Sequence, residues 1–206
     1  RDWDGHNWRA AGNGPSGEPF RFFPWDSEFA LSPNNSGAIQ SPNPISNALL
    51  TDVTNKNGNQ RPTGIHQKLK NNNWYRLKFA DHIRKHLFNG GPLSPEGAKT
   101  IWKKRSDSLE MAIIAESARW GDNARRTPYT RLDWIRTRDQ LLGTASGSSY
   151  SNYFPRRTEI VFNQFVRKNW YPSTDAPDFS QHGGQVSSDY QLRIENNGNG
   201  TIYYTT

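Results

Sequence analysis

The sequence contains no cysteine, and this absence removes several kinds of chemistry. Without thiols the chain has no disulfide, no zinc–thiolate site and no cysteine nucleophile. It also lacks any apolar run of about 18 residues, so we expect no membrane-spanning helix. The glycine-rich signatures of the Rossmann and P-loop nucleotide folds are missing as well.

Apolar residues are scarce in general, at 33% of the 206 residues, and the mean hydropathy is -0.95. Aromatic residues make up 13% of the chain and include eight tryptophans. A few large rings can anchor a small core, because each buries much apolar area. We therefore expect a folded core with long irregular borders, and we place Trp120, Trp134 and Trp170 in that core.

Basic residues outnumber acidic ones, with 26 Lys and Arg against 19 Asp and Glu. Such a surface attracts anions, among them nucleotides, phosphoproteins and acidic polymers, although a merely solvated basic surface has the same composition. The basic residues form no long run and no motif that reads DNA or RNA. Nucleic acid is therefore not the partner that we expect.

Helical periodicity fills the middle of the chain, from about residue 71 to residue 168. We expect four helices there, because each apolar segment is bounded by capping residues or glycine. Their expected bounds are residues 71–88, 94–121, 130–143 and 153–166. Thr130 opens the third helix, with Asp133 completing a shortened capping box. The polar stretch of residues 52–64 is typical of a loop.

Strand signals lie at the two ends of the chain. Residues 19–26 predict a short aromatic strand that ends in a loop. Residues 190–194 alternate, and residues 201–206 have high β propensity, so they predict a C-terminal hairpin. The fold class is then α+β and mainly helical, with one short hairpin at each end. Because an isolated hairpin is marginal in water, we expect the chain to be a piece of a larger protein.

The richest candidate site lies at the start of the chain, where Asp2, Asp4 and Asn7 are close together. In the catalytic loop of protein kinases, an Asp accepts the substrate hydroxyl proton, and an Asn five residues later binds magnesium. Asp2 and Asn7 have this spacing. Asp26, followed by Glu28, stands where a second metal-binding Asp is expected, and Mg²⁺ prefers such hard oxygen ligands.

Other interpretations of the same residues remain open. Asp-x-x-x-x-Asn is also typical of an Asx-rich turn. Asp2 and Asp4 have the alternate spacing that begins a calcium loop, but Asn7 and Asn13 stand where that loop requires Gly and Glu. We therefore set the calcium interpretation aside.

Two helical features further along the chain have ordinary structural explanations. His82 and His86 have the spacing of a zinc-binding pair, but the metalloprotease pattern requires Glu after the first His, so we expect a helix surface. Glu116 lies in an apolar helix. We expect it to be a buried carboxylate paired with Arg119 or Arg125.

With this context, the chain resembles the CotH kinase family, a group of atypical kinases named for a spore-coat protein. The Asp/His/Asn cluster precedes an aromatic strand and the Phe-Pro-Trp-Asp motif of residues 23–26, of which Pro-Trp-Asp is the most specific part. The resemblance extends from residue 1 to residue 171. Further matching segments are Phe-Ala-Asp-His at 79–82, His-Leu-Phe-Asn-Gly-Gly at 86–91 and Ile-Ala-Glu-Ser-Ala-Arg-Trp-Gly-Asp at 114–122.

This resemblance implies the roles of the site residues. Asp26 would bind the metal, Mg²⁺ or Mn²⁺, with Asn7 as the second ligand and Glu28 as a further acidic group beside them. ATP would be the co-substrate. Asp2 would be the catalytic-loop Asp by its spacing, and Asp4 is its close rival.

The resemblance also implies a division of the chain. Residues 1–172 would be the C-terminal lobe of a kinase-like domain whose ATP-holding lobe lies upstream, so we expect the chain alone to be inactive. Residues 173–185 would be a linker. Residues 186–206 would begin a truncated β-sandwich module, because residues 183–186 and 200–206 resemble a chitobiase/hexosaminidase C-terminal repeat.

The leading hypothesis is therefore a kinase-like protein that transfers the γ-phosphate of ATP to Ser or Thr of a protein substrate. By resemblance it would be a secreted or cell-surface protein of a bacterium. The alternative is a non-catalytic, kinase-like scaffold domain within a secreted multidomain surface protein.

Overall fold

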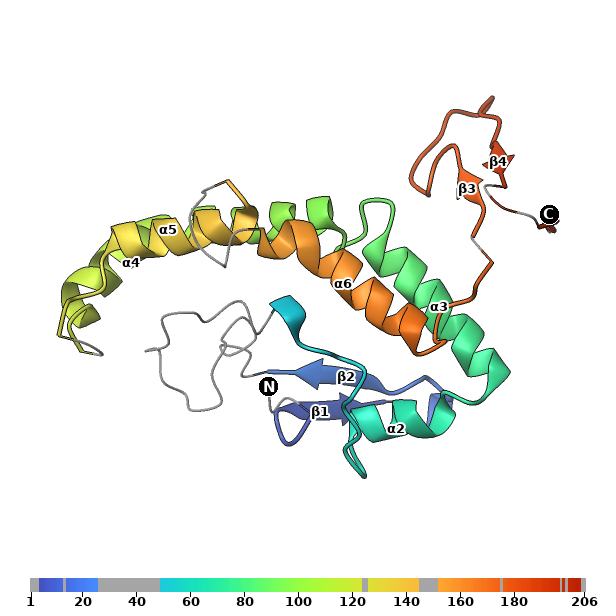
Figure 1. Ribbon diagram of the computed structural model, residues 1–206, viewed down its shortest axis with the longest axis horizontal. Helices are drawn as coiled ribbons and strands as arrows, with labels where there is room; N and C mark the ends of the chain where they lie inside the picture. Colours follow the sequence, from blue (N-terminus) through green and yellow to red (C-terminus); the bar gives the residue numbers. More distant parts are fainter. Residues whose placement is uncertain are drawn as a thin grey trace.

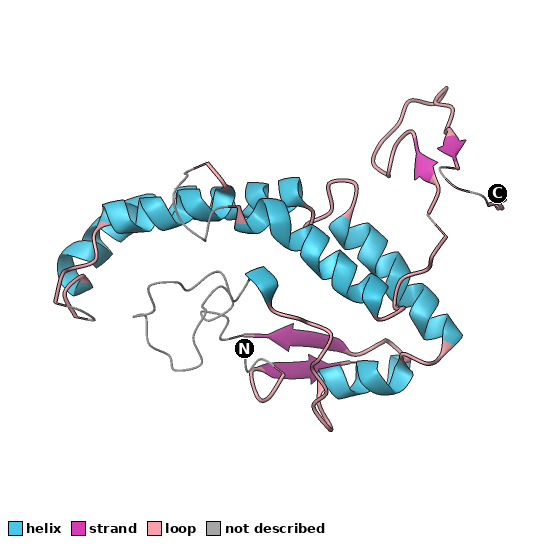
Figure 2. Ribbon diagram, viewed as in Figure 1, coloured by secondary structure: helices cyan, strands magenta, loops and turns pink. Residues whose placement is uncertain are grey.

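The structure is a computed structural model. It describes residues 4–12, 14–25, 49–123, 126–144, 152–174, 176–196, 198 and 200–204. Within these residues the chain is mainly helical, with two short antiparallel strand pairs (Figures 1 and 2). The predicted α+β class with short hairpins is confirmed. Among the described helices, none is long and apolar enough to cross a membrane.

The N-terminal hairpin consists of β1 (Trp8–Ala11) and β2 (Arg21–Pro24), joined through the short 3₁₀ helix Gly14–Ser16. The strands are antiparallel, with Trp8 opposite Pro24. The Arg9 guanidinium lies 4.8 Å from the centre of the Trp25 ring, as a cation–π pair. The aromatic strand predicted from the sequence is therefore present, as one half of this hairpin.

A helix that the sequence did not predict follows, α2 (Pro62–Leu69). The prediction of a loop over residues 52–64 is therefore wrong for its last three residues, which belong to α2. The N-cap residue Arg61 makes no side-chain cap hydrogen bond, so the local start signal is weak. Proline at the first position is the only local sign of a start.

The next two helices begin as the sequence predicts. In α3 (Asn73–Leu87) the side chain of Asn72 accepts a hydrogen bond from the main-chain N–H of Tyr75. In α4 (Pro95–Trp120) the Ser94 hydroxyl accepts from the N–H of Gly97, at 3.1 Å. These caps satisfy main-chain donors that helix starts leave unpaired.

The remaining helices are α5 (Arg131–Leu142) and α6 (Tyr153–Arg167). The capping box expected at Thr130 and Asp133 is confirmed, with both reciprocal hydrogen bonds present. Gly143 ends α5 in the left-handed region, at φ 80°, where a side chain would be strained.

Helix α6 organises the helical layer, because it contacts α3, α4 and α5 (Figure 1). The buried apolar residues gather mostly on these helices and just after α6; they are Leu49, Ala80, Ile83, Leu87, Leu141 and Trp170. Trp170 is in the core as predicted, and Trp134 is half-buried. Trp120 is 51% exposed, so its predicted core position is wrong; instead the Arg119 guanidinium lies 4.9 Å from its ring centre.

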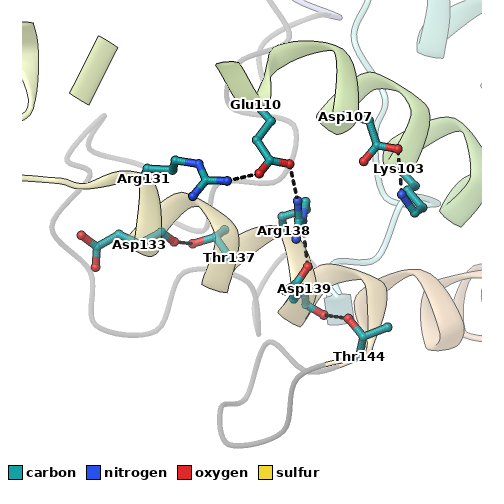
Figure 3. A network of polar contacts seen from close by, with 9 residues as sticks. All are labelled: Lys103, Asp107, Glu110, Arg131, Asp133, Thr137, Arg138, Asp139 and Thr144. Atoms are coloured by element: carbon teal, nitrogen blue, oxygen red, sulfur yellow. Dashed lines mark hydrogen bonds and ion pairs between the residues drawn. The ribbon is translucent and has the colours of Figure 1, made fainter. Parts of the chain in front are cut away.

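An ion-pair network joins α4 to α5 (Figure 3). Glu110 on α4 pairs with Arg131 and Arg138, and Arg138 also reaches Asp139 at 2.7 Å. The prediction that Glu116 is a buried carboxylate is wrong, because Glu116 is exposed. Glu116 follows Glu110 by six residues, which places its side chain about 120° around the helix axis from that of Glu110. Glu110 faces α5, so Glu116 does not.

The C-terminal strand pair differs from the predicted hairpin. Strand β3 (Asp178–Phe179) pairs with β4 (Ile194–Glu195), so of residues 190–194 only Ile194 is in a strand. The main-chain N–H of Ser180 donates to the Arg193 carbonyl, which continues the antiparallel pairing by one residue. Residues 201–204 are irregular, and residues 205 and 206 lie outside the described part.

Candidate functional site

Asp4 is a buried carboxylate, 4% exposed, at the start of the described chain. Its Oδ1 accepts a hydrogen bond from the main-chain N–H of Thr63 at 3.0 Å, and its Oδ2 accepts from the Thr63 hydroxyl at 2.6 Å. Thr63 is the second residue of α2, so Asp4 supplies the cap that Arg61 does not. The positive end of the helix favours a carboxylate there.

The contact between Asp4 and α2 depends on close approach of the loop before the helix. The main-chain N–H of Gly58 donates to the Thr63 hydroxyl at 3.0 Å. A Cβ on Gly58 would lie 2.7 Å from Oδ2 of Asp4, and one on Gly64 would lie 2.1 Å from the Gly58 carbonyl oxygen. Glycine is therefore required at both positions for the carboxylate to reach the helix.

Asn7 is the second predicted site residue that the structure describes, and it is 6% exposed. Its carbonyl accepts a hydrogen bond from the main-chain N–H of Trp25 at 3.1 Å, one step beyond the Trp8–Pro24 pair of the hairpin. The hairpin thereby brings the loop that carries Asn7 beside the Pro-Trp part of the Pro-Trp-Asp motif.

The other predicted site residues, Asp2, Asp26 and Glu28, lie outside the described residues. The structure therefore places two of the five, Asp4 and Asn7, and both are buried on the same loop. In the described ranges no group of three or more His, Asp or Glu side chains is arranged to hold a metal. The predicted ligand set draws Asp26 and Glu28 from outside those ranges.

A hollow of about 420 Å³ lies against the Asp4 loop. The lining residues that the structure describes are all polar, charged or glycine; they are Asp4, Gly5, His6, Asn55, Lys56, Asn57, Gly58 and Arg61. Lys56 and Arg61 are functional candidates that the sequence did not indicate. A Lys and an Arg in an Asn/Gly-rich loop carry no signal until the loop is folded against Asp4.

Hydrogen bonds from helices fix that loop. The Gln67 amide of α2 donates to the carbonyls of Thr54 and Lys56, at 3.2 and 2.9 Å. The hydroxyl and main-chain N–H of Thr54 both donate to Asp52, and these bonds lower the pKa of the Asp52 carboxyl. The loop is thus held at two points, and it presents Lys56 from a fixed backbone.

Residues 49–53, which precede the loop, are hydrogen-bonded to α6. The Gln164 side chain is buried; its oxygen accepts from the Val53 N–H at 3.1 Å, and its nitrogen donates to the Thr51 carbonyl at 3.0 Å. Arg157 donates to the carbonyls of Leu49 and Thr51. Two side chains of α6 therefore satisfy main-chain groups that the irregular segment leaves unpaired.

A half-buried histidine joins the other end of α2 to the helical layer. The Nδ1 of His66 lies 2.8 Å from the Tyr75 hydroxyl, and its ring centre lies 4.3 Å from that of Trp170. Its buried Nε2 has no hydrogen-bond partner. Desolvation, with a smaller contribution from Lys70, lowers the pKa of His66. By contrast, His82 and His86 stack on the surface of α3, as expected of a helix surface.

Comparison with known proteins gives no further information on the site. No family model matches the chain, and neither the curated proteins nor the solved structures gave a match.

Proposed function

We propose that the chain carries the metal-binding and catalytic segment of a kinase-like phosphotransferase that uses ATP. The observation that supports this most is the hydrogen bond from the Trp25 N–H to the Asn7 carbonyl. A kinase site needs its catalytic-loop Asn and its second metal-binding Asp side by side. Trp25 directly precedes Asp26, so the hairpin holds the two segments that the proposal requires together.

The proposed roles follow from the chemistry of the side chains. Asp26 and the side-chain oxygen of Asn7 would hold Mg²⁺ or Mn²⁺, and Glu28 adds negative charge beside them. When bound, the metal would neutralise charge on the phosphates of ATP. Asp2 would accept the proton of a Ser or Thr hydroxyl on the protein substrate.

The geometry of Asp4 supports the choice of Asp2 as the base. A general base must come within hydrogen-bond reach of the proton that it accepts. Both oxygens of Asp4 already accept hydrogen bonds from Thr63, and the residue is almost fully buried. We therefore assign Asp4 to the positioning of α2 and of the loop beside it, and not to proton transfer.

The alternative is a kinase-like domain that only binds, within a multidomain surface protein, and metal binding separates the two hypotheses. The test is a titration of the chain with Mn²⁺ followed by electron paramagnetic resonance. Loss of a second-shell partner alone weakens metal binding by about 10–100-fold, so Asp26→Asn should weaken it at least about tenfold.

Asp81→Asn is the matched control, because Asp81 is an exposed carboxylate on α3 and its loss should leave the affinity unchanged. Equal Mn²⁺ affinity in the wild-type chain and Asp26→Asn would contradict the proposal and favour the scaffold alternative.

A further inference from the structure

We propose that the hollow beside Asp4 binds acidic side chains of the protein segment that receives the phosphate. Lys56 and Arg61 would select that segment. This inference rests on the proposed function, because it names the kind of substrate that the same site prefers.

The charges around the hollow favour an anionic ligand. Lys56 and Arg61 are the two Lys or Arg side chains of its described lining. Among the described residues of the lining, Asp4 is the only acidic one, and both its oxygens accept hydrogen bonds from Thr63. The described side chains of the lining therefore include more basic than acidic groups, which favours an anionic ligand.

The form of the hollow suits a chain segment on the protein surface. Lys56, Arg61 and His6 are all exposed residues of the lining. Asn55 and Asn57 are exposed as well, and their amides can both donate to and accept from the main chain of a peptide. At about 420 Å³ the hollow has room for more than a single ion.

The position of the hollow favours the phosphate acceptor over the nucleotide. Asp4, Gly5 and His6 line it, and they lie between the proposed base Asp2 and the proposed metal ligand Asn7. Trp25, which precedes the proposed metal ligand Asp26 in the sequence, bonds to the Asn7 carbonyl and is not among the described residues that line the hollow. An acidic residue near the acceptor hydroxyl would reach Lys56 or Arg61 as that hydroxyl reaches the base.

The loop that carries the two basic residues is also held in place before any ligand binds. Gly58 is tied to Thr63, and the Lys56 carbonyl is tied to Gln67. A fixed backbone reduces the cost of ordering on binding.

The test measures the binding of two fluorescent serine peptides to the chain by anisotropy. One peptide carries Glu residues on both sides of the serine, and the other carries Gln in their place. The Glu peptide should bind more tightly. Since exposed ion pairs contribute about 0.2–1 kcal/mol, Lys56→Ala and Arg61→Ala should each weaken its binding by up to roughly five-fold, and the double variant by more.

The matched control is Lys68→Ala/Lys78→Ala, which removes two exposed positive charges from α2 and α3. It should leave the affinity for the Glu peptide unchanged. An equal loss in this control, or equal binding of the two peptides, would overturn the inference. The inference would also be overturned if pyrophosphate displaced the peptide and this competition required Lys56 and Arg61, because the hollow would then hold the phosphates of the nucleotide.

The Mn²⁺ titration separates this inference from the proposed function. The Lys56→Ala/Arg61→Ala variant should bind Mn²⁺ like the wild-type chain, whereas Asp26→Asn should lose Mn²⁺ and keep its preference for the Glu peptide. Normal Mn²⁺ binding without a preference for the Glu peptide would contradict this inference and leave the proposed function standing. A peptide preference without any Mn²⁺ binding would sink the proposed function alone.

Discussion

The Asp4 carboxylate caps a helix that begins far along the chain, accepting hydrogen bonds from the main-chain N–H and the hydroxyl of Thr63 at 3.0 and 2.6 Å. The two residues are 59 positions apart. This contact connects the loop that carries the proposed site to α2, and through α2 to the helical layer.

Replacing Asp4 tests its capping role. Asp4→Ala leaves the N–H and hydroxyl of Thr63 without their acceptor, so we expect a loss of about 1–3 kcal/mol in the free energy of unfolding. Urea denaturation followed by circular dichroism measures it. Asp81→Ala removes an exposed carboxylate from α3 and should change little. A stability loss below that of this control would contradict the cap.

Gln164 offers a second test, because it joins α6 to the segment before the Lys56 loop. Gln164→Leu keeps the approximate size of the side chain but leaves the Val53 N–H without its acceptor and removes one of the two donors to the Thr51 carbonyl, which Arg157 still reaches. We expect a loss of about 1–3 kcal/mol in the free energy of unfolding. Gln191→Leu, at an exposed position, is the control. Equal free energies of unfolding for the two variants would show that the Gln164 hydrogen bonds contribute nothing to stability.

His66 should make the stability depend on pH. Burial lowers its pKa below the usual 6.5, so near and below that value the unfolded chain binds a proton that the folded chain does not. Stability should therefore fall as the pH drops from about 7.5 to about 5, and His66→Phe should make this fall shallower.

The measurement for His66 is the melting temperature as a function of pH. His82→Asn is the control, because it removes an exposed histidine from the same chain and should keep the wild-type slope. An identical slope in wild type and His66→Phe would exclude His66 as the titrating group.

The Glu110 network predicts a small effect that depends on salt. Glu110→Gln weakens the pairs with Arg131 and Arg138, whose side chains are 40% and 19% exposed. We expect a loss of up to about 1 kcal/mol in dilute buffer, and less at high salt because ions screen such pairs. Glu116→Gln, on the exposed face of α4, should have no effect in either buffer. A loss that persists in high salt would contradict this account.

Features that neighbouring residues determine were predictable from the sequence. The capping box of Thr130 and Asp133 and the cap at Ser94 involve side chains within a single turn, so the starts of α4 and α5 followed directly. Helix α2 was missed because its cap, Asp4, is distant in sequence. Trp120 was misplaced because its environment depends on which face of α4 meets α5 and α6.

The candidate site stays a prediction, because the structure describes only Asp4 and Asn7 of its five residues. The spacing of Asp2, Asn7 and Asp26 led to the metal hypothesis, and the hairpin register was needed to bring Asn7 beside Trp25. The contact of Asp4 with Thr63, which the sequence does not show, supports the proposal that Asp2 is the base. Lys56 and Arg61 could not be found, because only the folded loop gathers them at one hollow.

The most direct test of the central claim is where Mn²⁺ binds, followed by NMR through the broadening of signals near this paramagnetic ion. We predict that the Trp25 indole and the Asn7 side-chain amide broaden first, while the buried Trp170 on the helical layer broadens only at excess metal. In Asp26→Asn this selective broadening should disappear. Uniform broadening, or the same selective pattern in Asp26→Asn, would contradict a metal site built from Asn7 and Asp26.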